Sequence, residues 1–240
     1  MPLSCHSAVK RHGSMTRPKV IDSTEMVVLI DKSGSMQKFS SKVILKSINQ
    51  LINNHKKISP NTIISVIAFN DQITQLVTRV MIDDMSDIVK EDIKPENTTA
   101  LYDGVSSGLD ILDDSSMSSK ILLVITDGLE NSSINSSHTH ICTKIADSLR
   151  KGFLVKFLGG GQDAIAIGLG LGIGEECCLS FSNDDYGIDG AMESATRSLE
   201  RHALGECHSF TPIERATSLS VPLPYIPGNC NVLGRISTLM

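Results

Sequence analysis

The chain has 240 residues, of which 40 per cent are hydrophobic, so it is long enough to bury a substantial core. No apolar run reaches the roughly 18 residues that span a bilayer, and the first residues lack the apolar segment of a signal peptide. The formal charge of -5 comes without a clustered basic stretch. We therefore expect a globular protein whose partners are neither membranes nor nucleic acids.

The cysteines indicate a reducing compartment. Six cysteines occur, with neither the C-x-x-C spacing of common zinc sites nor the density of a disulfide scaffold. Reduced thiols are typical of the cytosol, so the expected localisation is cytoplasmic.

The folded part of the chain is expected to be one domain between two tails. Residues 1 to 23 lack periodicity and mix proline, serine and basic residues, which predicts a flexible leader. Residues 24 to 218 carry the periodic segments and form the predicted domain. Residues 219 to 240 again lack periodicity and are predicted to be a flexible tail.

Strands and helices are predicted to alternate along this domain. Short apolar or β-branched runs predict strands, and apolar residues spaced three or four apart predict helices. The predicted strands are Val27 to Ile30, Thr62 to Asn70, Gln72 to Val80, Lys120 to Thr126, Phe153 to Leu158 and Cys177 to Phe181. The predicted helices are Lys42 to His55, Leu101 to Leu112, Ile141 to Leu149, Asp163 to about Leu171 and Asp185 to Gly205, with Met81 to Glu96 weakly helical.

This alternation predicts an α/β fold. We expect a doubly wound, mostly parallel sheet with helices on both faces and one antiparallel edge strand, the half-exposed Gln72 to Val80. Gly104 and Gly108 lie four residues apart on a predicted helix, so that helix face is expected to approach the sheet backbone closely.

A row of polar side chains follows the first predicted strand. Val27 to Ile30 ends in Asp31, and Ser33 and Ser35 follow at alternate positions. A strand that is apolar on both faces belongs in the middle of a parallel sheet, where ligands collect at the carboxyl ends of the strands. Gly34 is expected to let the chain turn tightly, so that these oxygens converge. Oxygen-only donors select a hard cation such as Mg²⁺.

These residues resemble the metal-ion-dependent adhesion site of the von Willebrand factor A (VWA) domain, which begins with an Asp, Ser, Ser triplet at this spacing. The family adds a Thr, commonly in a Gly-Thr-x-Leu-Tyr-Asp context, and an Asp after another buried strand. NTTALYDGV places Thr99 at the Thr position, with Thr98 in place of the usual Gly, and ILLVITDG places Asp127 at the Asp position. The resemblance implies a Rossmann-like VWA fold and a metal site of Asp31, Ser33, Ser35, Thr99 and Asp127.

The later part of the chain is similar to an intracellular bacterial and phage-type subgroup of VWA proteins. The similar segments are FLGGGQDAIA, Phe157 to Ala166, and SFTPIERATS, Ser209 to Ser218. That subgroup usually reads Gly-Ala-Asn-Gln-Asp where this chain has Gly159 to Asp163.

The resemblance implies a metal-dependent protein-protein interaction module and not an enzyme. In the family the hydroxyls bind Mg²⁺ or Mn²⁺ directly, the two acids act largely through water, and one position is left for an acidic residue of the partner. The implied partner is an unidentified protein with an exposed Asp or Glu, of the kind represented by ATPases or stress-response proteins. Asp103 and Glu130 are expected to be helix and loop charges and not ligands.

The residues also leave alternatives open. Asp31 ends a strand and could attack phosphate in a metal-dependent phosphohydrolase, but such chemistry usually has a second acid two residues on, where this chain has Ser33. A dinucleotide site at Gly168 to Gly174 is weaker, because these glycines do not open a helix directly after a first strand.

Overall fold

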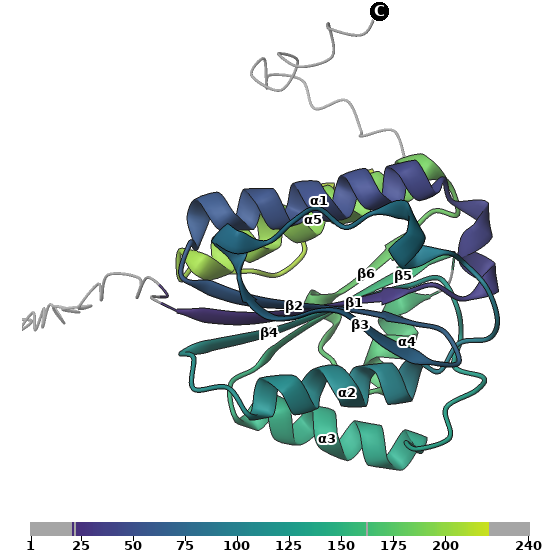
Figure 1. The fold of residues 1–240 in the computed structure, drawn as a ribbon, viewed down its shortest axis with the longest axis horizontal. Coiled ribbons are helices and arrows are strands. Elements are labelled where there is room, and N and C mark those ends of the chain that lie inside the picture. Colours follow the sequence, from purple (N-terminus) through teal and green to yellow (C-terminus); the bar gives the residue numbers. More distant parts are fainter. Residues whose placement is uncertain (1–20, 22, 162, 221–240) are drawn as a thin grey trace, which may run out of the picture.

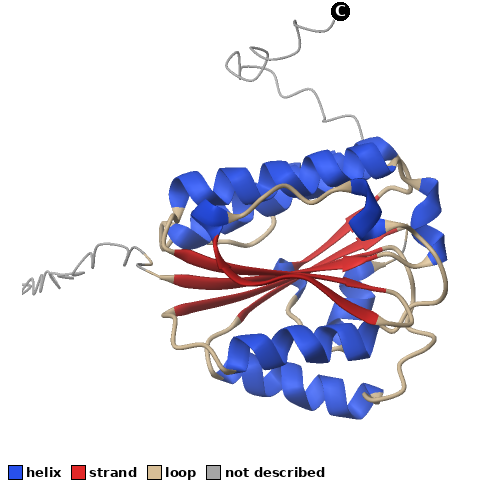
Figure 2. Cartoon of the chain, viewed as in Figure 1, coloured by secondary structure: helices blue, strands red, loops and turns tan. Residues whose placement is uncertain are grey.

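A six-stranded sheet in the order β3-β2-β1-β4-β5-β6 forms the middle layer of the molecule (Figure 2). The computed structural model describes residues 21, 23–161 and 163–220, so the predicted tails lie almost wholly outside the described residues. The strands are β1 (Thr24–Asp31), β2 (Thr62–Phe69), β3 (Ile73–Met81), β4 (Ser119–Thr126), β5 (Leu154–Gly160) and β6 (Cys178–Phe181). The α-helices are α1 (Ser41–Ile58), α2 (Leu101–Asp113), α3 (His138–Arg150), α4 (Ala164–Gly170), α5 (Asp185–Ala203) and α6 (Pro212–Ser218).

The helices cover both faces of this sheet, as predicted. Helices α1 and α5 pack together on one face, and α2 and α3 pack together on the other (Figure 1). Every neighbouring pair of strands is parallel except β2 and β3, which are antiparallel. The fold class is therefore confirmed, including the single antiparallel edge strand, whose residues are all exposed or half-buried.

The sheet reverses its order of winding between β1 and β4. The chain passes from β1 outwards to β2 and β3, and then returns to the other side of β1 with β4, β5 and β6. All eight residues of β1 are buried, and Ile30 pairs with Ile125 of β4 near the carboxyl ends of both strands. In doubly wound sheets this reversal point is where loops separate and ligands bind.

Helix α2 lies close to the sheet because of its glycines. A Cβ at Gly108 would lie 2.8 Å from a Leu122 methyl group, and a Cβ at Gly104 would lie 3.1 Å from the Phe69 ring. Contacts this short leave no space for a larger side chain. The predicted close approach is confirmed, and it places α2 against β1, β2 and β4.

Two segments differ from the prediction. Met81 to Glu96 was expected to be weakly helical, but it holds only two short 3-10 turns, Ile82–Asp84 and Lys90–Ile93. Ile82, Ile88 and Ile93 are buried at spacings that do not fit one α-helix, so tertiary packing decides this conformation. Helix α6 was not predicted, because its seven residues carry too few apolar positions to show periodicity.

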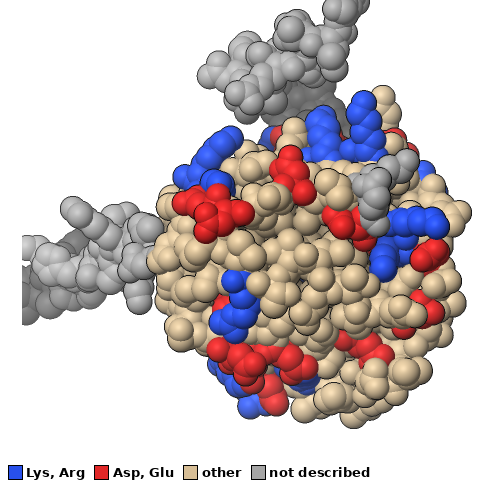
Figure 3. All heavy atoms as spheres, viewed as in Figure 1, with Lys and Arg blue, Asp and Glu red and all other residues tan. Residues whose placement is uncertain are grey.

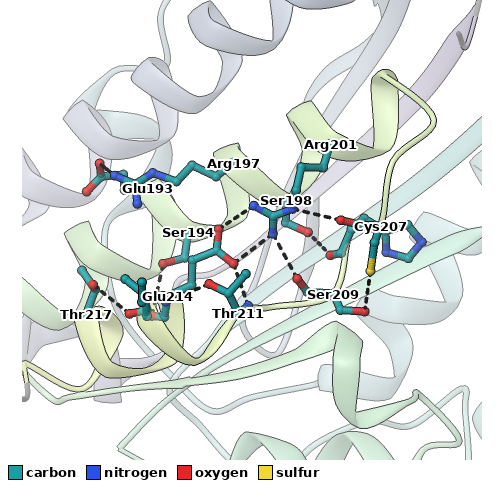
Figure 4. Close-up of polar contacts among 12 residues, drawn as sticks. Glu193, Ser194, Arg197, Ser198, Arg201, Cys207, Ser209, Thr211, Glu214 and Thr217 are labelled. Atoms are coloured by element: carbon teal, nitrogen blue, oxygen red, sulfur yellow. Dashed lines mark hydrogen bonds and ion pairs between the residues drawn. The ribbon is translucent and has the colours of Figure 1, made fainter. Parts of the chain in front are cut away.

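A polar network fastens α6 to α5 (Figure 4). The Arg201 guanidinium donates to both carboxylate oxygens of Glu214, at 2.8 and 2.9 Å, and also to the carbonyls of Cys207 and Ser209. Glu214 in turn accepts from the Thr211 backbone at 2.8 Å in a capping box. A bidentate pair with one buried partner fixes the geometry of this carboxyl-terminal hairpin.

The face drawn in Figure 3 shows no single dominant sign of charge. Basic and acidic side chains lie beside one another there in small groups. No helix in the described part of the chain is long and apolar enough to cross a membrane.

One histidine lies in the core without a hydrogen-bond partner for either ring nitrogen among the described residues. This residue, His55 of α1, is buried, and burial lowers its pKa from 6.5 to about 4. Between these two values the unfolded chain binds a proton at His55 that the folded chain does not. The free energy of unfolding should therefore fall as pH decreases from 6.5 to 4.

We predict that His55→Leu makes the fold less sensitive to acid. The variant lacks the group whose pKa is about 2.5 lower in the folded chain than in the unfolded chain. Between pH 6.5 and 4 its free energy of unfolding should therefore fall by up to about 3 kcal/mol less than that of the parent. Urea unfolding at several pH values measures this. The matched control is His140→Leu, since His140 is exposed on α3. Equal pH slopes for the parent and His55→Leu would contradict the prediction.

Candidate metal centre

The first loop of the site begins at Asp31, the last residue of β1. Asp31 is 2% exposed, and its Oδ1 accepts a 2.7 Å hydrogen bond from the backbone of Ser33. This turn aims the Ser33 hydroxyl at Ser35, and their Oγ atoms lie 2.9 Å apart. The predicted triplet therefore converges on one point.

Gly34 has a different role from the one predicted. Its φ is not in the left-handed region, so the turn itself does not demand glycine. Instead, the Gly34 amide donates to the Asn97 carbonyl at 2.9 Å, and a Cβ at Gly34 would lie 3.2 Å from that oxygen. The missing side chain lets the first loop lie directly against the second.

The second loop carries Thr99 just before α2. Thr99 is 3% exposed, and its amide donates to the Asn131 side chain at 2.8 Å while its carbonyl accepts from the Asn131 amide at 3.0 Å. The preceding residue, Thr98, is exposed. Of the two threonines, Thr99 is thus the one that faces the other site residues.

The third loop follows β4, next to β1 in the sheet. The Thr126 hydroxyl donates to Asp31 Oδ2 at 2.5 Å, and the Ser35 hydroxyl donates to Asp127 Oδ1 at 2.6 Å. The first and third loops are therefore joined by two short hydrogen bonds, one to each acid.

Gly128 of the third loop lies against side-chain oxygens of the other two loops. A Cβ at Gly128 would lie 2.7 Å from Thr99 Oγ1 and 3.4 Å from both Asp31 Oδ2 and Ser35 Oγ. Oxygens of the first and second loops therefore surround Gly128 of the third loop, and a side chain at position 128 would press against them.

The two acids have different surroundings. Asp31 accepts hydrogen bonds on both carboxylate oxygens, yet burial dominates and raises its pKa above the ordinary value. Asp127 has a fully buried side chain, and no described group hydrogen-bonds to its Oδ2. Lys38 Nζ lies 2.8 Å from this oxygen and forms an ion pair with it.

Two further acids hold the third loop in place, and their role was not predicted. Asp103 of α2 accepts from the backbone of Ile134 and Asn135, and Glu130 accepts from the backbone of Ser132, Ser133 and Tyr102. Both acids were expected to be ordinary helix and loop charges. Their position within a few residues of Thr99 and Asp127 was the available signal.

These residues fit a hard cation chemically. Three hydroxyls and two carboxylates supply only oxygen donors, which Mg²⁺ and Mn²⁺ accept, and Asp127 Oδ2 is a buried acceptor with no hydrogen-bond donor among the described residues. The described residues hold no group of three or more His, Cys, Asp or Glu placed for a metal. A centre here would therefore depend mainly on hydroxyls.

Known structures share this fold. The von Willebrand factor domain of the type V pili tip protein Mfa5 from Porphyromonas gingivalis has a TM-score of 0.60 and 10% identity, over 77% of this chain and 97% of that one. The pilus adhesin SpaC from Lactobacillus rhamnosus GG has a TM-score of 0.59 and 10% identity, over 78% of this chain and 32% of that one. The PilB minor pilin from Streptococcus sanguinis has a TM-score of 0.56 and 12% identity, over 76% of this chain and 62% of that one.

The chain spans less than two thirds of PilB and of SpaC, although it spans nearly all of the Mfa5 domain. No curated protein matches the sequence. The sequence model of the von Willebrand factor type A domain matches residues 25–164, which is more than half of the 240 residues and includes all three loops of the site. The chain therefore belongs to the von Willebrand factor type A domain family.

Proposed function

We propose that the chain is a binding module that recognises an acidic residue of a partner protein through Mg²⁺ or Mn²⁺. The proposal rests on one observation: side-chain oxygens of the first and second loops surround Gly128 of the third loop, and the Ser35 hydroxyl bonds to Asp127 of that third loop. The residues proposed to hold the cation are Asp31, Ser33, Ser35, Thr99 and Asp127.

The residues divide into two roles in this proposal. Asp31 holds Ser33 and Thr126 in place through both of its oxygens, so it orients the donors around it. Ser33, Ser35 and Thr99 offer neutral hydroxyls. When bound, a cation surrounded mostly by neutral donors keeps enough positive charge to attract a carboxylate from outside.

The similar structures support a binding role. Three of them are named as a pili tip protein, a pilus adhesin and a minor pilin. At 10 to 12% identity these likenesses concern the fold, so the partner of this chain does not follow from theirs. We propose an unidentified protein with an exposed Asp or Glu, such as an ATPase or a stress-response protein.

The proposed compartment is the cytoplasm. Four cysteines in the described part of the chain are free thiols: Cys142, Cys177, Cys178 and Cys207. Cys207 is exposed, and free exposed thiols persist best in a reducing environment.

The geometry favours binding over phosphohydrolysis. A nucleophilic Asp31 would need a free oxygen directed at phosphate, but both of its oxygens accept hydrogen bonds and the residue is 2% exposed. Position 33, where a second acid would stand, is Ser33.

We predict that the protein with Mg²⁺ or Mn²⁺ does not hydrolyse p-nitrophenyl phosphate or nucleoside triphosphates. The reason is that Asp31 is engaged as a hydrogen-bond acceptor on both sides. A steady-state phosphate-release assay measures this. Sustained turnover that is lost in Asp31→Asn would favour the phosphohydrolase instead.

The Thr99 hydroxyl provides a second prediction. Thr99→Ala should weaken Mg²⁺ binding at least about tenfold, because water replaces a donor that the second loop holds in place. Isothermal titration with Mg²⁺ measures the change. Thr98→Ala is the matched control, since Thr98 is the exposed neighbour of the same residue type. If Thr98→Ala weakens binding and Thr99→Ala does not, the second loop contributes through the other threonine.

Gly128 provides a test that removes no ligand. Gly128→Ala should abolish Mg²⁺ binding, because its Cβ would occupy the space 2.7 Å from Thr99 Oγ1. Gly170→Ala is the control, since a Cβ there meets nothing within 4 Å. Circular dichroism and thermal melts establish that both variants fold. Unchanged titration of a folded Gly128→Ala protein would place the cation elsewhere.

A further inference from the structure

A lysine reaches into the metal centre from the end of its first loop. Lys38 closes the short 3-10 helix Gly34–Lys38, and its Nζ lies 2.8 Å from Asp127 Oδ2. The Asp127 side chain is fully buried, whereas the Lys38 side chain is 34% exposed. The ammonium therefore supplies positive charge to a buried carboxylate from the solvent side of the site.

Lys38 supplies the positive charge that compensates the buried Asp127 carboxylate. Asp127 Oδ1 is taken by the Ser35 hydroxyl, and Oδ2 has no hydrogen-bond donor among the described residues. A buried carboxylate without a cation is costly, and the ion pair with Lys38 offsets that cost. A divalent cation beside the same oxygen would repel the ammonium strongly, because the surroundings screen the two charges poorly.

We propose that Lys38 is an internal cation that competes with the metal for Asp127, so that metal binding requires the ammonium to leave. This inference rests on the proposed function of the metal centre. Asp31 and Asp127 carry two formal negative charges, and Lys38 neutralises one of them. A divalent ion neutralises both, which is why the exchange is electrostatically possible.

The release of Lys38 needs only its side chain to move. The next residue, Phe39, is buried and packs against Phe181 with ring centroids 5.9 Å apart, so the backbone at this point is anchored. The Lys38 ammonium also lies 5.3 Å from the Phe39 ring centroid, and a third of the side chain faces solvent. Rotation of the exposed side chain therefore frees Asp127 without displacing Ser33 or Ser35.

Lys32 is a natural comparison for Lys38. It follows Asp31 directly, but its Nζ donates to the Thr74 hydroxyl on β3 at 3.2 Å, and among the described residues it forms no ion pair with either acid of the site. Removing either lysine takes one positive charge from the neighbourhood of the metal centre. Only the removal of Lys38 frees a carboxylate oxygen.

The experiment compares Mg²⁺ and Mn²⁺ titrations of the parent, Lys38→Met, Lys32→Met and Lys38→Arg. Lys38→Met should bind the metal about tenfold more tightly or better, within the 5- to 150-fold range typical of coupled sites. Lys32→Met should change the Kd by about twofold at most, since the Lys32 ammonium bonds to the Thr74 hydroxyl and not to a carboxylate of the site. Lys38→Arg keeps the positive charge and should bind no more tightly than the parent.

A second measurement follows Lys38 directly. Brief acetylation with an N-hydroxysuccinimide ester, read by peptide mass spectrometry, reports how accessible each lysine is. The reactivity of Lys38 should rise when Mg²⁺ is added to the parent protein, while that of Lys32 should not change. Equal reactivity of Lys38 with and without bound Mg²⁺ would overturn the proposal.

The outcomes separate this inference from the proposed function. If the parent binds metal and Lys38→Met binds it equally or less tightly, the competition is wrong but the metal centre stands. If no folded variant binds either metal, the metal centre itself is wrong and the competition with it. If only Lys38→Met binds, the competition is supported in its strongest form.

Discussion

The parallel pairing of β1 with β4 is the constraint on which the site depends. This pairing runs from Thr24 to Ile30 along β1, so the residues that follow each strand leave the sheet at neighbouring points. Asp31 and Asp127 are thereby brought together although 96 positions separate them in the sequence. Because both strands are buried and the winding reverses between them, their loops are free to meet above the sheet edge.

Hydrogen bonds then turn this proximity into a defined arrangement. Two hydrogen bonds join the first and third loops, one from Thr126 to Asp31 and one from Ser35 to Asp127. A third hydrogen bond, from the Gly34 amide to the Asn97 carbonyl, joins the first loop to the second. The two bonds to Asp31 and Asp127 satisfy buried carboxylate oxygens that would otherwise destabilise the fold. The arrangement leaves Asp127 Oδ2 with charge but without a hydrogen-bond donor, and Lys38 lies beside that oxygen. The same loops therefore bring the oxygen donors together and place two carboxylates, Asp31 and Asp127, beside a single ammonium, that of Lys38.

The sequence predicted most of the fold, because its strands are apolar on both faces and its helices alternate with them. It also indicated the metal triplet that follows the first strand, while the resemblance to the VWA family implied Thr99 and Asp127; that these five residues hold a metal stays a prediction. Lys38 could not be predicted, because its contact with Asp127 depends on the path of a 3-10 turn that carries no periodic signal. Helix α6 had a readable signal in the Thr-Pro-Ile-Glu capping pattern that begins at Thr211, although its apolar pattern is too short to reveal it.

The central claim is that one hard cation is bound among the hydroxyls of Ser33, Ser35 and Thr99. The most direct measurement is a crystal structure of the protein grown with Mn²⁺, with diffraction data collected where manganese scatters anomalously. The account predicts one strong anomalous peak within coordination distance of these three hydroxyls, beside Gly128. A crystal of this protein whose anomalous map has no peak at this position, or has its strong peak elsewhere, would contradict the account.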